Sequence, residues 1–212
     1  MVRETRVYVV DDDAAVAKSI CWLMESADHP ARALAGAHEL LALLPLEGEG
    51  CIVTDVRMPG MDGLALIIAL AEAGCDLPVV VITAHGDIRM AVEAMKLGAL
   101  DFVEKPFEEK ALLAAVENAL AESRRRRETL SADADARRGL ESLSPREREV
   151  LAMILAGKPN RRVASELKIS EKTVEVHRAH IMEKTGAGSF AELVTMAVQT
   201  GFGRGAPRRS SR

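Results

Sequence analysis

The segment YVVDDDAAV, residues 8–16, begins as a short apolar strand and ends on three consecutive aspartates, Asp11, Asp12 and Asp13. Adjacent carboxylates repel one another, so this arrangement is unfavourable unless a cation lies among them or one of them has another task. Further strand-like apolar runs occur at residues 51–55, 78–83 and 101–104, with a weaker one at 31–34.

Segments with helical periodicity separate these strands. They span residues 14–27, 36–44, 64–72 and 88–97, and a fifth helix is expected to begin near Phe107. The runs at 51–55 and 78–83 are continuously apolar, which is typical of central parallel strands covered on both faces. Repeated strand–helix alternation over residues 1–121 predicts a doubly wound α/β fold with a parallel five-stranded sheet. In such sheets ligands bind at the carboxyl ends of the strands.

Charge divides the chain into two parts. Residues 1–121 hold 9 Lys and Arg against 20 Asp and Glu, whereas residues 122–212 hold 19 against 12, for net charges of −11 and +7. The length of 212 residues fits one large or two small domains, and the change of sign favours two. Only the basic half is expected to bind nucleic acid. We see no secretion signal and no membrane span, and expect a cytoplasmic protein.

Residues 122–142 are polar and rich in both charges, and we interpret them as a linker that could be a helical extension of the preceding helix. Its RRRR run, residues 124–127, could contact DNA phosphates, but such runs more often form a solvated face. Residues 143–202 have the pattern of a small all-α domain of four helices, and the basic tail at 203–212 is expected to be disordered. Ser144, Asn160, Ser170 and Ser189 are the expected starts of the four helices.

Polar side chains follow the strands at one edge of the predicted sheet. Asp55 ends the third strand as Asp11 and Asp12 end the first, while Thr83 and Lys105 end the fourth and fifth. Clustered carboxylates need a cation, and hard oxygen ligands suit Mg²⁺. The set is suited to phosphoryl transfer onto Asp55, with the metal and Lys105 neutralising the phosphoryl oxygens and Thr83 donating to one of them.

Longer motifs connect these residues to a known family. The stretches VVDDD, VTDVRMPGMDG, VVVITAHGD and AMKLGALDFVEKPF together resemble the receiver domain of two-component response regulators. LSPREREVLAMILAGKPNRRVASELKISEKTVEVHRAHIMEKTGAGS resembles the LuxR-type helix-turn-helix domain. Both domains in this order are most similar to the FixJ-type regulators, over about residues 1–121 and 142–202. The resemblance implies a flavodoxin-like receiver with strand order 2-1-3-4-5.

The resemblance also implies roles for individual residues in a Mg²⁺ site. Asp55 would be the phosphoacceptor, and Asp12 would bind the metal directly. Asp11 would hold it directly or through water, and the backbone carbonyl of Arg57 would be a further ligand. Asp13 is expected only to cap the first helix. The side chains of Arg57 and His85 could tune dephosphorylation.

A conformational switch is the next implication of the resemblance. Thr83 would move toward the phosphoryl group, and Phe102 would rotate into the space that it leaves. The bond between Lys105 and Pro106 would be cis. The face made by the fourth helix, fifth strand and fifth helix would then form a homodimer, or phosphorylation would simply release the DNA-binding domain; the sequence does not decide between these.

The DNA-binding half predicts its own set of contacts. Two helices joined by KIS, residues 168–170, fit a helix-turn-helix whose second helix enters the major groove. Val174, Ile181 and Val176 are expected to face the core or the groove floor. The residues expected to contact bases are Lys172, Thr173, Glu175 and Arg178, and those expected to contact phosphates are Lys184 and Arg162. The net charge of only +2 over residues 144–203 favours a dimer on two half-sites.

These features predict a response regulator that is phosphorylated by a sensor histidine kinase and binds a double-stranded DNA operator, with RNA polymerase as a further partner. Two alternative functions fit the sequence less well. A phosphorylation-independent regulator would lack one of Asp55, Thr83 and Lys105, and all three are present. A Mg²⁺-dependent aspartyl phosphatase needs a second Asp two residues after the first, where this chain has Arg57. We therefore expect no enzyme beyond self-phosphorylation and autodephosphorylation.

Overall fold

The computed structural model describes residues 6–46, 48–84 and 88–202. The chain forms two compact units that divide after Arg127. The expected disorder of residues 203–212 and the expected role of His85 lie outside the described residues. No helix in the described part of the chain is long and apolar enough to cross a membrane.

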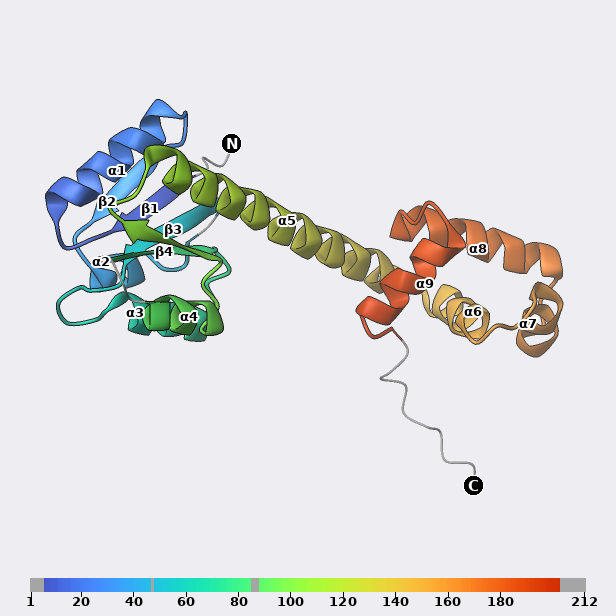
Figure 1. Ribbon diagram of the computed structural model, residues 1–212. Helices are drawn as coiled ribbons and strands as arrows, with labels where there is room; N and C mark the ends of the chain where they lie inside the picture. The colour runs from blue at the N-terminus through green and yellow to red at the C-terminus, as the bar shows by residue number, and fades with distance from the viewer. Residues whose placement is uncertain (1–5, 47, 85–87, 203–212) are drawn as a thin grey trace, which may run out of the picture. The chain divides into compact units, whose positions relative to one another are not determined.

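The first unit is built on a five-stranded parallel sheet with the order β2-β1-β3-β4-β5, as expected (Figure 1). The strands are β1 (Arg6–Val10), β2 (Ala31–Leu34), β3 (Gly50–Asp55), β4 (Val79–Ala84) and β5 (Asp101–Lys105). The helices are α1 (Ala14–Ser26), α2 (Ala37–Leu41), α3 (Gly63–Glu72), α4 (Ile88–Lys96) and α5 (Glu109–Glu141). The predicted doubly wound fold is confirmed.

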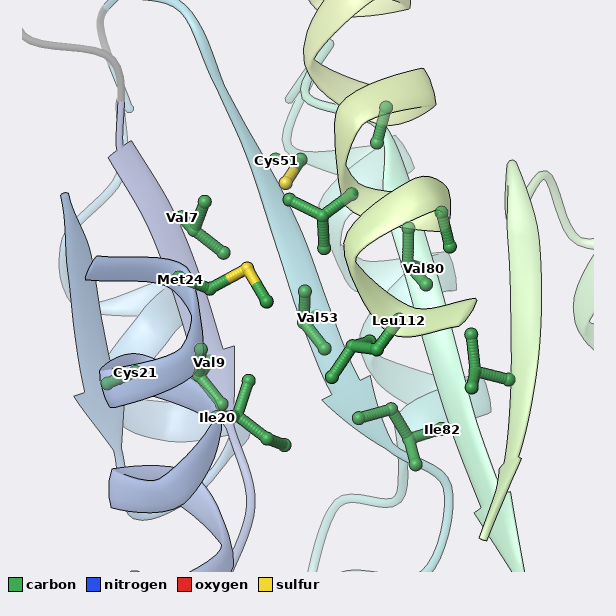
Figure 2. Close-up of a cluster of buried hydrophobic side chains, with 14 of the residues drawn as sticks. Val7, Val9, Ile20, Cys21, Met24, Cys51, Val53, Val80, Ile82 and Leu112 are labelled. Carbon is green, nitrogen blue, oxygen red and sulfur yellow. The ribbon is translucent and has the colours of Figure 1, made fainter. Parts of the chain in front are cut away.

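Helices cover both faces of this sheet, which explains its continuously apolar strands. On one face, Ile20 and Met24 of α1 and Leu112 of α5 pack against Val7 and Val53 (Figure 2). On the other face, side chains of α2, α3 and α4 pack against the strand residues that point the opposite way. The helices are thus held on the sheet by their buried apolar side chains. Trp22 is an exception among the large apolar residues of α1, because it lies on the outer side of the helix and is 72% exposed.

Two aspartates cap helices in this unit, and the first of them, Asp13, was predicted to do so. The carboxylate of Asp13 accepts hydrogen bonds from the backbone N–H groups of Ala15 and Val16, so this third aspartate begins α1. Asp62 caps α3 in the same way, by accepting from the N–H of Ala65. The thiols of Cys21, Cys51 and Cys75 are free, the first two buried and the third half-buried.

The segment predicted as a linker is helical, because α5 continues without a break to Glu141. Three residues of the RRRR run bind groups of the first unit. Arg125 and Arg126 donate to Glu122, and Arg126 also donates to the carbonyl of Asp76 at 3.0 Å. Arg124 lies 3.9 Å from Glu49. Arg124 and Arg126 thus connect α5 to other parts of the first unit, whereas the pair of Arg125 with Glu122 lies within the helix.

The second unit contains the end of α5 together with α6 (Pro145–Leu155), α7 (Asn160–Leu167), α8 (Glu171–Thr185) and α9 (Phe190–Gln199). Ser144 starts α6 as predicted and forms a capping box with Glu147, and Ser170 and Ser189 cap α8 and α9. The expected cap at Asn160 is wrong: Pro159 is the N-cap of α7 and forms no side-chain cap. The amide oxygen of Asn160 instead accepts a hydrogen bond from Arg178.

Candidate functional site

The carboxyl ends of three strands bring Asp11, Asp55 and Lys105 together. Asp11 follows β1, while Asp55 and Lys105 are the last residues of β3 and β5. The ammonium of Lys105 donates to Asp11 Oδ2 at 2.9 Å and to Asp55 Oδ1 at 2.6 Å. Asp11 and Asp55 are only 3% and 8% exposed, so both carboxylates are buried at the carboxyl edge of the sheet.

Backbone N–H groups bind the other oxygen of each carboxylate. The N–H of Asp13 donates to Asp11 Oδ1 at 2.9 Å, and the N–H of Arg57 donates to Asp55 Oδ2 at 2.6 Å. Burial alone would lower the pKa of Lys105, but its hydrogen bonds to Asp55 and Asp11, with their negative charge, raise it overall. Lys105 is therefore charged at neutral pH and balances part of the charge of the two aspartates.

The loop after Asp55 passes very close to this residue. The N–H of Gly63 donates to the carbonyl of Val56, and a Cβ placed on Gly63 would lie 2.3 Å from the carbonyl oxygen of Asp55. No side chain fits there, so glycine at 63 allows α3 to start directly against the end of β3. This packing fixes the backbone that carries the Asp55 carboxylate.

Asp12 is not part of the buried cluster. It is exposed, and no group of three or more carboxylate, imidazole or thiol side chains converges on a metal position within the described residues. The remaining donors still fit Mg²⁺, which prefers oxygen ligands. Asp11 Oδ2 and Asp55 Oδ1 both accept from Lys105 Nζ, at 2.9 and 2.6 Å, and the two oxygens are therefore at most 5.5 Å apart. Two oxygens on opposite sides of a Mg²⁺ ion are about 4.2 Å apart.

Two further predicted residues lie beside the cluster on β4 and β5. Thr83 is buried one residue before the end of β4 and is aligned with Glu104. Phe102 is 45% exposed, on the same strand as Lys105. The bond between Lys105 and Pro106 is cis, as the resemblance implied, and so is the bond between Leu44 and Pro45.

The predicted helix-turn-helix is formed by α7 and α8. Val163 and Ala164 of α7 and Val174 and Ile181 of α8 are buried in one cluster, as expected. Val176, in contrast, is 47% exposed. Lys172 and Glu175 are exposed with it, and so is Ala179, which the sequence did not single out. Ala179 follows Glu175 by four residues and Val176 by three, and this helical spacing could have identified it as part of the same side of α8.

Arg178 lies at the border between the buried and the exposed side of α8. Its side chain is half-buried, donates to Asn160 at 3.3 Å, and has its guanidinium carbon 5.4 Å from the centre of the Phe190 ring. It follows buried Val174 by four residues and exposed Glu175 by three, so helical spacing places it between the two sides. The expected base contact of Arg178 stays a prediction.

Lys184 and Arg162 both form ion pairs within the unit. Lys184 donates to the buried carboxylate of Glu147 at 2.8 Å, and the Arg162 Nε lies 3.2 Å from Glu166. Hydrogen bonds from Lys184 and from Ser144 lower the pKa of Glu147 to about 2, against the effect of its burial. The pair joins the start of α6 to the end of α8.

Two family descriptions match the chain. Residues 7–117 match "Response regulator receiver domain", and residues 141–197 match "Bacterial regulatory proteins, luxR family". The chain is 43% identical over 204 residues to the transcriptional regulatory protein FixJ of Bradyrhizobium diazoefficiens, covering 95% of this chain and 98% of that protein. It is 41% identical to the tetrathionate response regulatory protein TtrR of Salmonella typhimurium, covering 89% of each chain.

Solved structures give the same result. The response regulator StyR superposes with a TM-score of 0.80 at 41% identity, covering 92% of this chain and 99% of that one. Full-length FixJ from B. japonicum superposes with a TM-score of 0.57 at 42% identity, covering 92% and 97%.

Proposed function

The chain belongs to the response regulators that join a receiver domain to a LuxR-type DNA-binding domain, and from this premise we propose that Asp55 is its phosphoacceptor. The observation that carries the proposal is the geometry at Asp55, whose carboxylate is buried and bound by Lys105 at 2.6 Å. A lysine at hydrogen-bond distance from the attacking oxygen can also bind the phosphoryl oxygens. Asp62 and Asp13, by comparison, only cap helices.

In the proposed reaction, an oxygen of Asp55 attacks the phosphorus atom of a phosphohistidine on a sensor kinase. The new O–P bond forms as the N–P bond breaks, and the imidazole leaves with the bonding electron pair and takes up a proton. Lys105 stays within reach of both Asp11 and the phosphoryl oxygens, and the buried Thr83 donates its hydroxyl to one of these oxygens.

We propose Asp11, Asp12, Asp55 and the backbone carbonyl of Arg57 as the residues that hold Mg²⁺. When bound, this ion would neutralise phosphoryl oxygens and orient them toward the attacking carboxylate. The support is the chemistry of the donors and the closeness of the Asp11 and Asp55 oxygens. Asp12, which is exposed at the mouth of the cluster, would have to turn inward.

We propose that α8 reads DNA with its exposed side. Lys172 and Glu175 supply a donor and an acceptor for base edges, and Val176 supplies an apolar contact for a thymine methyl group. Ala179 extends the same side by one turn. Arg162 is 71% exposed at its side chain and remains a proposed phosphate contact.

Thr173, Arg178 and Lys184 have bonds within the unit that favour a supporting role. The N–H of Thr173 donates to the cap Ser170, Arg178 binds Asn160, and Lys184 binds Glu147. We propose that these three residues hold α8 in place, so that DNA contacts from them are secondary to this role.

Phosphorylation is proposed to promote a homodimer through the face made by α4, β5 and α5. Three large apolar side chains on this face are exposed: Val92, Met95 and Phe102, at 47%, 43% and 45%. Rotation of Phe102 would change this surface when Thr83 moves toward the phosphoryl group. The dimer would bind an operator with two half-sites, with RNA polymerase as a further partner.

Incubation with acetyl phosphate and Mg²⁺, followed by intact-mass measurement, tests the central step. The wild type should gain the mass of one phosphoryl group, and Asp55→Asn should not. Asp62→Asn is the matched control, since Asp62 is an exposed carboxylate that only caps α3. An adduct of equal yield on Asp55→Asn would show that another residue accepts the phosphoryl group.

A further inference from the structure

Gly139 lies inside α5, two residues before the helix ends at Glu141. Glycine is among the least favourable residues inside a helix, because it loses more backbone freedom on folding than any other residue. Its backbone is not in the left-handed region, unlike that of Gly186, which ends α8. The local backbone therefore gives no reason for glycine at this position.

The surrounding space gives that reason. A Cβ on Gly139 would lie 2.8 Å from the Cα of Thr185 and 3.0 Å from the carbonyl oxygen of Lys184. Both neighbours are backbone atoms of α8, so no flexible side chain could move aside. The hydroxyl of Thr185 donates to the carbonyl of Ile181 at 2.7 Å, and Thr185 is buried. The two helices thus meet backbone to backbone at the last turn of α8.

This contact belongs to the core of the second unit. Ala136 and Leu140, on the turns beside Gly139, are both buried. Leu140 packs in the same cluster as Val174 and Ile181 of α8. The match to the luxR family begins at residue 141, so Ala136, Gly139 and Leu140 lie outside it. The end of α5 thus acts as an additional helix of the DNA-binding unit.

The same helix follows the strand that ends on Lys105. α5 starts at Glu109, four residues after Lys105, and continues to Glu141. We propose that Gly139 is a positioning residue of α8: it lets α5 contact α8 backbone to backbone, and through this contact α5 sets the position of the DNA-reading side. The inference rests on the proposed role of α8 in reading DNA.

The test compares Gly139→Ala with wild type in the full-length protein, with Ala134→Ser as the control. Both substitutions add one heavy atom to α5, but Ala134 is exposed. Operator DNA is first selected from a genomic library with wild-type protein treated with acetyl phosphate. The dissociation constant is then measured for each protein over a series of salt concentrations, together with the folded fraction at the assay temperature.

We expect Gly139→Ala to bind operator DNA at least tenfold more weakly than wild type, and Ala134→Ser to bind like wild type. The slope of log K against log salt reports the number of phosphate contacts, and a displaced α8 should lose about one or more of them. A loss of folded protein alone would weaken binding without changing this slope. Equal affinity of Gly139→Ala and wild type, or weaker binding with an unchanged slope, would overturn the inference.

Hydrogen exchange on the wild type covers the case in which Gly139→Ala does not fold. Protection of amides 136–141 and 181–185 should change together when operator DNA binds. A change at 181–185 with none at 136–141 would also overturn the inference. A wild type that selects no DNA overturns the proposed function itself, whereas equal binding by wild type and Gly139→Ala overturns only the role of Gly139.

Discussion

Lys105 is the residue whose contacts are most informative about the acceptor site. Its ammonium binds two buried carboxylates from different strands, so it compensates a repulsion that would otherwise oppose folding. The sequence correctly placed Asp11, Asp55 and Lys105 at one sheet edge, because parallel strands end on the same side. It did not predict that the lysine itself bridges the two aspartates, because the position of a residue on a strand does not fix where the end of a long lysine side chain lies.

Replacing Lys105 by Met should lower the free energy of unfolding at pH 7 by about 2 kcal/mol, since two charge-assisted hydrogen bonds are lost. The pKa of Lys105 is raised in the folded state. Its contribution is therefore present below the ordinary lysine pKa and is lost as the pH rises through the higher folded value. Urea unfolding at pH 7 and above pH 11 measures this, with the exposed Lys110→Met as control. Equal unfolding midpoints at pH 7 would contradict the prediction.

Glu147 makes a second prediction at this scale. Its buried carboxylate accepts from Lys184 and from the N–H of Ser144, so Glu147→Gln should lower the free energy of unfolding of the second unit by about 1–2 kcal/mol. The pKa of Glu147 is depressed from 4.5 to about 2. The contribution is thus complete above pH 4.5 and is lost as the pH falls toward 2.

Thermal unfolding of Glu147→Gln and wild type between pH 2 and pH 7 checks this dependence. The difference between the two proteins should be constant above pH 5 and should shrink below about pH 4. The exposed Glu183→Gln on α8 serves as the control and should behave like wild type. A difference that grows on acidification would show that the ion pair with Lys184 is not the source of the stability.

At the scale of elements, α8 shows where sequence reasoning succeeds and where it fails. Its start at Ser170, its end at Gly186 and its buried Val174 and Ile181 follow from capping residues and helical spacing. Arg178 does not, because a charged residue is normally read as exposed. Here the Phe190 ring and the amide oxygen of Asn160 contact the guanidinium, so the side chain is half-buried. Those partners come from α9 and α7, which local patterns in α8 do not reveal.

α5 gives a prediction for a whole element. Leu130 is 55% exposed and lies between the part of α5 that packs on the sheet and the part that packs on α8. Leu130→Pro should break the helix at a local cost of about 3 kcal/mol while removing no core contact. Phosphoryl uptake by Asp55 should remain, whereas the gain in operator affinity on phosphorylation should become smaller.

Leu130→Ala is the control for this variant, because it removes the same side chain and keeps α5 helical. Operator affinity is measured for both variants with and without acetyl phosphate. If Leu130→Pro responds to phosphorylation as fully as Leu130→Ala does, then α5 does not need to be continuous for signalling.

At the scale of the whole molecule, the fold class and the two-part organisation agree with expectation because they depend on repeated patterns, and the strand order agrees with what the family resemblance implied. The alternation of strands and helices and the contrast of −11 against +7 in net charge can still be recognised when single residues are assigned wrongly. The linker was the least predictable part, since its polar sequence fits both a coil and a solvated helix. The helix carries exposed ion pairs such as that of Glu122 with Arg125.

The low charge of the DNA-binding half leads to a prediction about assembly. Because residues 144–203 carry a net charge of only +2, a single copy should bind weakly and two copies should bind one operator together. Inserting about 5 base pairs between the half-sites should abolish joint binding, and about 10 should restore it, since half-sites must lie on the same face of the duplex. Gel-shift titration with phosphorylated protein measures this, and affinity that is indifferent to spacing would contradict a dimer.

The exposed Trp22 on α1 has a practical consequence for all of these measurements. It is the only tryptophan in the chain and is 72% exposed, so its indole is surrounded by water in the folded protein as in the unfolded one. Its emission should therefore barely shift on denaturation, and circular dichroism is the better probe of unfolding. The same indole should shift strongly to the blue when another protein covers α1, which makes the chain its own fluorescent reporter of docking at that helix.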